Sequence, residues 1–279
     1  MANSTPYAVF LDIDGTILNP LYPDGLSPAT CRVIADMQRR GHYFFLNTGR
    51  SPGYFACCGI SKEKFDGVCA GLGTYAELHG KILYTDPIPD ATVQELIEYC
   101  ARYKETCFIE SDADGEDGRY SFRNDGAFHA SRHWDEPAAF FKATSGRTFY
   151  KITIPYLPNA EYRAFLERHF DMIYCTEQKA TPEQRGEAAY AEGANRGCDK
   201  GCAVRRVCAL LNIPVERSIA IGDSENDLGM LRAAGISVAM GSAPDEVKKQ
   251  CDHVTDTVAN DGAARAIVSL LGGDGKEYF

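Results

Sequence analysis

The sequence lacks the features that mark membrane proteins, secreted proteins and nucleic-acid-binding proteins. Its 279 residues contain no apolar run long enough to span a bilayer, and residues 1–6 show no positive region followed by an apolar segment. Lysine and arginine form no basic block and the formal net charge is −10, so we expect neither nucleic acid nor a membrane as a partner. The chain also has no internal repeat and no low-complexity tract.

The cysteines lack the spacing of a disulfide framework. There are 11 of them, an odd number scattered along the chain, which favours reduced thiols and predicts a cytoplasmic protein. Cys198 and Cys202 lie four residues apart, as do His129 and His133, but each pair supplies only half of a zinc site. We interpret them as buried thiols and as part of a polar face.

The most informative feature that is present is the segment Asp12-Ile13-Asp14-Gly15-Thr16, which directly follows the apolar run 7–11. Alternate side chains of a strand share a side, so Asp12 and Asp14 can project together while Gly15 lets the backbone turn. Two carboxylates this close raise each other's pKa unless a cation compensates them. Ligands that are all oxygen favour magnesium over zinc.

Apolar runs alternate with amphipathic stretches at both ends of the chain. The pattern predicts strands at 7–11, 42–46, 67–70, 218–221 and 236–240, and helices at 28–40, 200–211 and 225–234. This alternation indicates a doubly wound parallel α/β core of the Rossmann type, formed by residues 1–84 and 195–279. Residues 85–194 alternate less regularly and predict an inserted α+β domain, with hinges at residues 87–89 and 193–197.

Three further polar clusters adjoin predicted core elements. Thr48-Gly49-Arg50 follows the second strand, Asp199-Lys200-Gly201 begins a helix, and residues 222–227 follow a later strand with the sequence Gly-Asp-Ser-Glu-Asn-Asp. Ligands of open α/β sheets bind beyond the carboxyl ends of the strands, so we expect these clusters to converge on one crevice.

Together, these segments resemble the four motifs of the haloacid dehalogenase superfamily. Residues 10–16 match the first motif, Thr48-Gly49-Arg50 the second, Lys200-Gly201 the third and residues 222–227 the fourth. An α+β insert between the second and third motifs is similar to the C2B-type cap of the Cof-type sugar-phosphatase branch. The resemblance implies magnesium-dependent hydrolysis of phosphomonoesters through an aspartyl-phosphate intermediate.

The resemblance also implies roles for individual residues. Asp12 would be the nucleophile, and Asp14 would protonate the leaving alcohol and then deprotonate the attacking water. Mg²⁺ would be held by Asp12, by the backbone carbonyl of Asp14, by Asp223 and, directly or through water, by Asp227. The residues expected to bind the phosphoryl group are Thr48, Gly49, Lys200 and Asn226.

The expected substrate is a small phosphorylated metabolite, in particular a sugar or polyol phosphate enclosed by the cap. Four side chains of the insert are candidates for substrate recognition, namely Arg123, His129, Arg132 and Trp134. For Trp134, packing inside the cap is the alternative role.

Other functions remain open at this point. A phosphosugar mutase or phosphotransferase would use the same motifs, whereas a non-catalytic sugar-phosphate sensor would not require both Asp12 and Asp14. Residues 71–76 also match a loose dinucleotide-binding pattern, but that pattern requires a long helix directly afterwards, and residues 82–84 predict a strand.

Overall fold

The computed structural model describes residues 5–55, 59–113, 118–123, 132–177, 188–272 and 275–279. The chain divides into two compact units. The first unit comprises Met1–Gly49, Cys58–Thr85 and Asp199–Phe279, and the second comprises Arg50–Cys57 and Asp86–Cys198. In the part of the chain that is described, no helix has the length and apolar character needed to cross a membrane.

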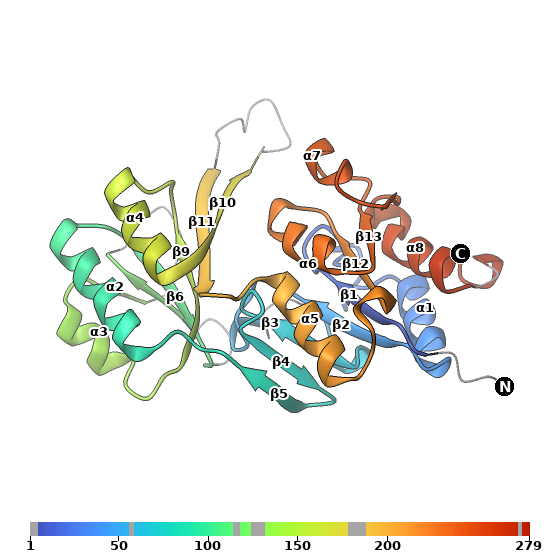
Figure 1. The fold of residues 1–279 in the computed structure, drawn as a ribbon, viewed down its shortest axis with the longest axis horizontal. Coiled ribbons are helices and arrows are strands. Elements are labelled where there is room, and N and C mark those ends of the chain that lie inside the picture. Colours follow the sequence, from blue (N-terminus) through green and yellow to red (C-terminus); the bar gives the residue numbers. More distant parts are fainter. Residues whose placement is uncertain (1–4, 56–58, 114–117, 124–131, 178–187, 273–274) are drawn as a thin grey trace. The chain divides into compact units, whose positions relative to one another are not determined.

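The first unit is built on an eight-stranded sheet, and six of its strands run parallel (Figure 1). The two remaining strands, at one edge of the sheet, each pair antiparallel with the strand before them in the chain. In spatial order the strands are β14 (His253–Val254), β13 (Ile236–Ala239), β12 (Ser218–Gly222), β1 (Ala8–Leu11), β2 (Tyr43–Asn47), β3 (Gly67–Ala70), β4 (Tyr75–Leu78) and β5 (Lys81–Thr85). Because β1 lies between β12 and β2, the segments that follow these three strands meet at one edge of the sheet.

Helices cover both faces of this sheet, as a doubly wound fold requires. Helices α5 and α6 pack with Phe10 and Phe45 in one apolar cluster, whereas α1 packs against α8 and β2. The helices of this unit are α1 (Pro28–Arg39), α5 (Lys200–Leu210), α6 (Leu228–Ala233), α7 (Asp245–Lys248) and α8 (Gly262–Leu271). Helix α1 begins as its sequence predicts, because the Ser27 side chain caps it and Pro28 occupies its first turn.

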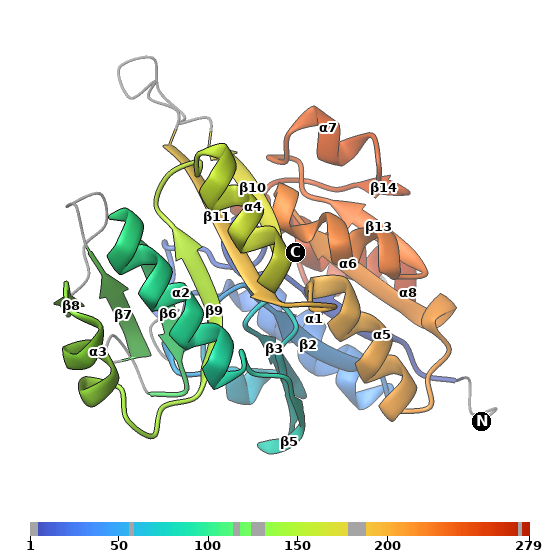
Figure 2. The same ribbon diagram turned by 60° about the vertical axis from the view of Figure 1, so that its left-hand side comes forward.

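The second unit contains a six-stranded sheet with helices packed on one face (Figure 2). Its neighbouring strands are antiparallel except for the last pair. The spatial order is β10 (Phe170–Glu177), β11 (Ala188–Asn195), β9 (Phe149–Ile154), β6 (Cys107–Ser111), β7 (Arg119–Phe122) and β8 (His133–Trp134). Helices α2 (Asp90–Tyr103), α3 (Pro137–Ala143) and α4 (Ala160–His169) enclose an apolar core against this sheet.

Several local expectations differ from the structure. Residues 193–195, predicted to be part of a hinge, belong to β11 and pair with β10. The small residues of β11 have weak strand propensity, so the pairing with its neighbours decides its conformation. The predicted helix at 225–234 is a 3₁₀ turn over Glu225–Asp227 followed by α6. After residues 71–74 the chain enters β4 and no helix, so the structure does not support the dinucleotide-binding pattern.

Candidate active site

The candidate site lies where β12, β1 and β2 end. Asp12 directly follows β1, Thr48 follows β2, and Asp223 follows β12. The Asp12 amide donates to the carbonyl of Ile221, with 3.0 Å between N and O, so parallel pairing continues up to the carboxylate. The strand order thereby brings together polar residues that are more than 200 positions apart in the sequence.

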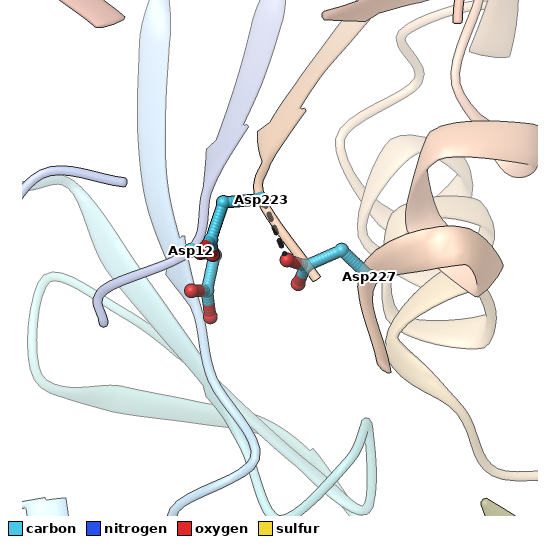
Figure 3. Close-up of side chains that lie close together, drawn as sticks. All are labelled: Asp12, Asp223 and Asp227. Atoms are coloured by element: carbon cyan, nitrogen blue, oxygen red, sulfur yellow. Dashed lines mark hydrogen bonds between the residues drawn. The ribbon is translucent and has the colours of Figure 1, made fainter. Parts of the chain in front are cut away.

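Three carboxyl groups gather at this edge (Figure 3). Oxygen atoms of Asp12, Asp223 and Asp227 all lie within 4.8 Å of one another. Among the described residues, they form the one group of carboxylates, thiols or imidazoles that is close enough to hold a metal ion. Within the described part of the chain, Cys198, Cys202 and His133 thus do not take part in a zinc site.

Backbone amides fix the orientation of Asp227. Its Oδ2 accepts hydrogen bonds from the amide of Asp223 at 2.9 Å and from the amide of Ser224 at 3.1 Å. The hydroxyl of Thr16 lies 3.4 Å from Oδ1 of Asp223 and donates to it. Thr16 belongs to the first motif, but sequence reasoning gave it no role, and this bond is what it contributes.

Gly15 allows the first motif to approach the fourth. Its φ is +81°, and a Cβ atom at this position would lie 2.1 Å from Oδ2 of Asp223. Any side chain here would clash with that carboxylate and would also strain the backbone. Glycine is therefore required for the observed position of Asp223.

Lys200 pairs with two of these carboxylates. It is the first residue of α5, whose N-cap is Asp199. Its Nζ lies 2.6 Å from Oδ1 of Asp12 and 2.6 Å from Oδ1 of Asp227, and it also donates to Oδ1 of Asn226 at 3.3 Å. The side chain is only 1% exposed, so this is a buried ammonium group.

Burial and mutual repulsion perturb the titration of these groups. Burial, together with the charge of Asp227, raises the pKa of Asp12 to about 8. The same two causes raise the pKa of Asp223 to about 7. For Lys200, burial disfavours the ammonium form, but the carboxylates of Asp12 and Asp227 outweigh it and raise its pKa. One ammonium group therefore does not compensate three carboxylates.

This donor set fits a magnesium ion. All three side chains offer oxygen, which is the ligand type that Mg²⁺ prefers, and the uncompensated negative charge favours a cation. Asp227 already binds two amides and Lys200, so its oxygens are less accessible than those of Asp12 and Asp223. Asp14 is exposed at the turn after Asp12.

The expected phosphate-binding residues also lie in the first unit. Thr48 and Gly49 are buried at the end of β2. The Thr48 amide donates to the carbonyl of Cys69 at 2.9 Å, so this amide is already used within the sheet. The neighbouring Asn47 donates from Nδ2 to the carbonyl of Lys200 at 2.9 Å and so joins β2 to the start of α5.

Three of the four candidates for substrate recognition lie on or beside the paired strands β7 and β8 of the second unit. Arg123 follows β7 with φ at +56°, and its amide donates to the carbonyl of Trp134. Trp134 packs against Tyr120 and Phe140 at the edge of the apolar core, which favours its alternative role in packing. Arg132 precedes β8 and is exposed, and His129 lies outside the described residues.

Comparison with known proteins gives matches over nearly the whole chain. A family model described as haloacid dehalogenase-like hydrolase matches residues 9–267. YkrA of Bacillus subtilis (strain 168) is 27% identical over 269 residues, which cover 94% of this chain and 96% of YkrA. Phosphatase YwpJ of the same organism is 45% identical over 80 residues, which cover 29% of this chain and 28% of YwpJ.

Solved structures show the same fold. BT1666 from Bacteroides thetaiotaomicron, described among phosphatases of the haloalkanoate enzyme superfamily, has a TM-score of 0.77 at 21% identity and covers 97% of both chains. BT4131, described as a sugar phosphatase of subclass IIB, has a TM-score of 0.72 at 21% identity, covering 95% of this chain and 99% of its own.

Proposed function

The chain belongs to the haloacid dehalogenase-like hydrolase family, and from this premise we propose that it is a magnesium-dependent phosphatase of small phosphorylated metabolites, sugar phosphates in particular. The observation that carries the proposal is the buried cluster of Asp12, Asp223 and Asp227 around Lys200. Phosphoryl transfer depends chiefly on positioning and on charge neutralisation, and this cluster supplies both.

Mg²⁺ would be held by the carboxylates of Asp12 and Asp223 and by the backbone carbonyl of Asp14, with Asp227 contributing directly or through water. When bound, the ion supplies the positive charge that keeps Asp12 ionised and offsets its repulsion from the phosphate. Asp227 keeps the Asp223 amide and Lys200 in place through its hydrogen bonds.

Asp12 attacks phosphorus and forms the aspartyl-phosphate, while the ester oxygen leaves as an alcohol. Asp14 donates the proton that this alcohol needs and afterwards takes a proton from the attacking water. The exposed position of Asp14 suits a residue that must exchange protons with substrate and water. Lys200, Thr48, Gly49 and Asn226 bind the oxygens of the transferring phosphoryl group.

We also propose that residues 1–84 and 195–279 act as the catalytic core and residues 85–194 as the cap that selects substrates. The compact second unit additionally includes Arg50–Cys57, which directly follows the phosphate-binding residues Thr48 and Gly49.

The proposal is tested by the Asp12→Asn variant with p-nitrophenyl phosphate and Mg²⁺. Asparagine keeps the shape of the side chain but removes the anionic nucleophile, so kcat should fall by at least about a thousandfold. Asp24→Asn is the matched control, because Asp24 is an exposed carboxylate of the same unit that pairs with Lys64. A rate near that of the wild type in Asp12→Asn would contradict the proposed mechanism.

A further inference from the structure

Asn47, the last residue of β2, is a polar side chain on the face of the first unit's sheet that packs against α5 and α6. Phe45, two residues earlier and therefore on the same face, belongs to the apolar cluster formed with these helices. Cys69 of β3, which pairs with Asn47, and Met230 of α6 belong to the same cluster. Asn47 is 0% exposed. An amide side chain thus stands where the surroundings suit an apolar one.

The amide group of Asn47 uses its donor and leaves its acceptor without a partner. Both atoms that face Nδ2 are acceptors, namely the carbonyl oxygen of Lys200 at 2.9 Å and the sulfur of Met230 at 3.5 Å. Oδ1 is buried and has no hydrogen-bond partner among the described residues. Because a buried acceptor without a partner costs stability, folding alone does not account for an asparagine at this position.

The hydrogen bond from Asn47 fixes the first turn of α5 to the sheet. Lys200 is the first residue of this helix and lies 153 positions from Asn47 in the sequence. The same turn packs closely against α6, where a Cβ atom on Gly201 would lie 2.3 Å from the carbonyl oxygen of Gly229. The backbone of Lys200 is therefore tied to β2 through Asn47 and to α6 through the two glycines.

The position of this backbone determines where the ammonium group of Lys200 lies. Nζ is 2.6 Å from Oδ1 of Asp12 and 2.6 Å from Oδ1 of Asp227, and the proposed mechanism requires this cation beside the transferring phosphoryl group. Thr48 directly follows Asn47, so a single peptide unit separates it from the residue that holds Lys200. A displacement of about 1 Å at such a site can lower the rate by about a hundredfold.

We propose that Asn47 is a positioning residue of the phosphatase reaction, which sets the ammonium group of Lys200 relative to Thr48 and Asp12. It acts through the backbone of Lys200 and not by contact with the phosphoryl group. The unpartnered Oδ1 is the cost in stability that accompanies this role. The inference rests on the proposed phosphatase function and adds to it a residue outside the four motifs.

The test compares Asn47→Leu with the wild type on p-nitrophenyl phosphate and Mg²⁺. Leucine has the same branching but cannot donate to the carbonyl of Lys200. Its side chain suits the apolar neighbours and removes the unpartnered oxygen, so the melting temperature should stay the same or rise. In contrast, kcat should fall by about tenfold or more while KM stays within about twofold, because the positioned cation stabilises charge in the transition state.

Two further single variants separate the hydrogen bond from packing. Asn47→Ala cannot overpack the site, so it decides the test if Asn47→Leu does not fold, and its kcat should fall by a similar factor. Met230→Leu removes the sulfur that faces Nδ2 with little change in volume. It should leave kcat within about twofold of the wild type.

A double-variant cycle tests whether the effect passes through Lys200. Lys200→Arg keeps a cation but moves its charge, so the remaining turnover no longer uses the geometry that Asn47 maintains. Asn47→Leu should therefore change kcat by less than about threefold in this background, since the effects of coupled residues do not add. The full fall of about tenfold in both backgrounds would overturn the positioning of Lys200 by Asn47.

A kcat near that of the wild type in the variants of Asn47 would also overturn the inference, as would an equal fall of kcat in Met230→Leu. Both results would leave the phosphatase function intact. A wild-type protein that hydrolyses neither p-nitrophenyl phosphate nor sugar phosphates with Mg²⁺ would instead contradict the proposed function, and the inference with it.

Discussion

Adding Mg²⁺ should raise the melting temperature of the metal-free protein, because the three carboxyl groups at the ends of β1 and β12 are not fully compensated by positive charge. Asp12, Asp223 and Asp227 lie close together, and among the described residues the ammonium group that pairs with this cluster is that of Lys200, which contacts Asp12 and Asp227. A divalent ion that binds the folded protein and not the unfolded chain adds its binding free energy to folding. The perturbation is simple, since the same sample can be measured with a chelator and with magnesium.

The expected size follows from mass action. At a free concentration of about 100 times Kd, a ligand adds about 2.7 kcal/mol to the free energy of unfolding. At about 2 to 4 °C per kcal/mol for a chain of this size, the melting temperature should rise by about 5 to 11 °C. Asp223→Asn should abolish most of the rise and Asp24→Asn should keep it, as followed by scanning calorimetry.

The rise should also depend on pH. The pKa of Asp12 is raised to about 8 and that of Asp223 to about 7, both above the ordinary value of 3.8. Between pH 3.8 and these raised values, the folded protein therefore binds more protons than the unfolded chain. The metal-free protein therefore loses stability as pH rises through that window, and protons compete with Mg²⁺ at its acidic end. The rise should be larger near pH 8 than near pH 5. No rise at either pH, or an equal rise in Asp223→Asn, would refute the reasoning.

Two further substitutions test the contacts of the cluster. Lys200→Met leaves the carboxylates of Asp12 and Asp227 without their cation. The free energy of unfolding, measured with denaturant, should fall by about 3 to 5 kcal/mol at neutral pH and by less in acid. A loss below about 1 kcal/mol would argue against the buried ion pairs. Gly15→Ala places a Cβ atom 2.1 Å from Asp223 Oδ2. The value of kcat should therefore fall by about a hundredfold or more, and the magnesium-induced rise in melting temperature should disappear. If the variant kept its kcat and the rise, the observed position of Asp223 would not be needed for activity or metal binding.

Much of the first unit could be predicted because local signals and topology agree in it. The alternation of apolar runs with amphipathic stretches predicted the parallel sheet, and the carboxyl ends of its strands bring Asp12 and Asp223 together. The predicted family, fold class and phosphatase class are confirmed by the matches over nearly the whole chain. The roles of the individual residues remain proposals.

Contacts set by tertiary pairing could not be predicted. Strand β11 contains mostly alanine and glycine and has little strand propensity of its own. The charged residues Arg119, Glu110, Lys151 and Glu192 come from four strands of the second unit, and they share one face of its sheet only through the register of β7, β6, β9 and β11. Likewise, nothing in the sequence indicates that two backbone amides and Lys200 would occupy the oxygens of Asp227.

The central claim is that Asp12 carries the phosphoryl group during turnover. Rapid mixing of the protein with p-nitrophenyl phosphate and Mg²⁺, followed by acid quenching and peptide mass spectrometry, tests it directly. The account predicts a peptide containing Asp12 with the added mass of one phosphoryl group, lost in Asp12→Asn and absent without substrate. A phosphorylated peptide from elsewhere in the chain, or product formation with no modified Asp12 at any quench time, would contradict it.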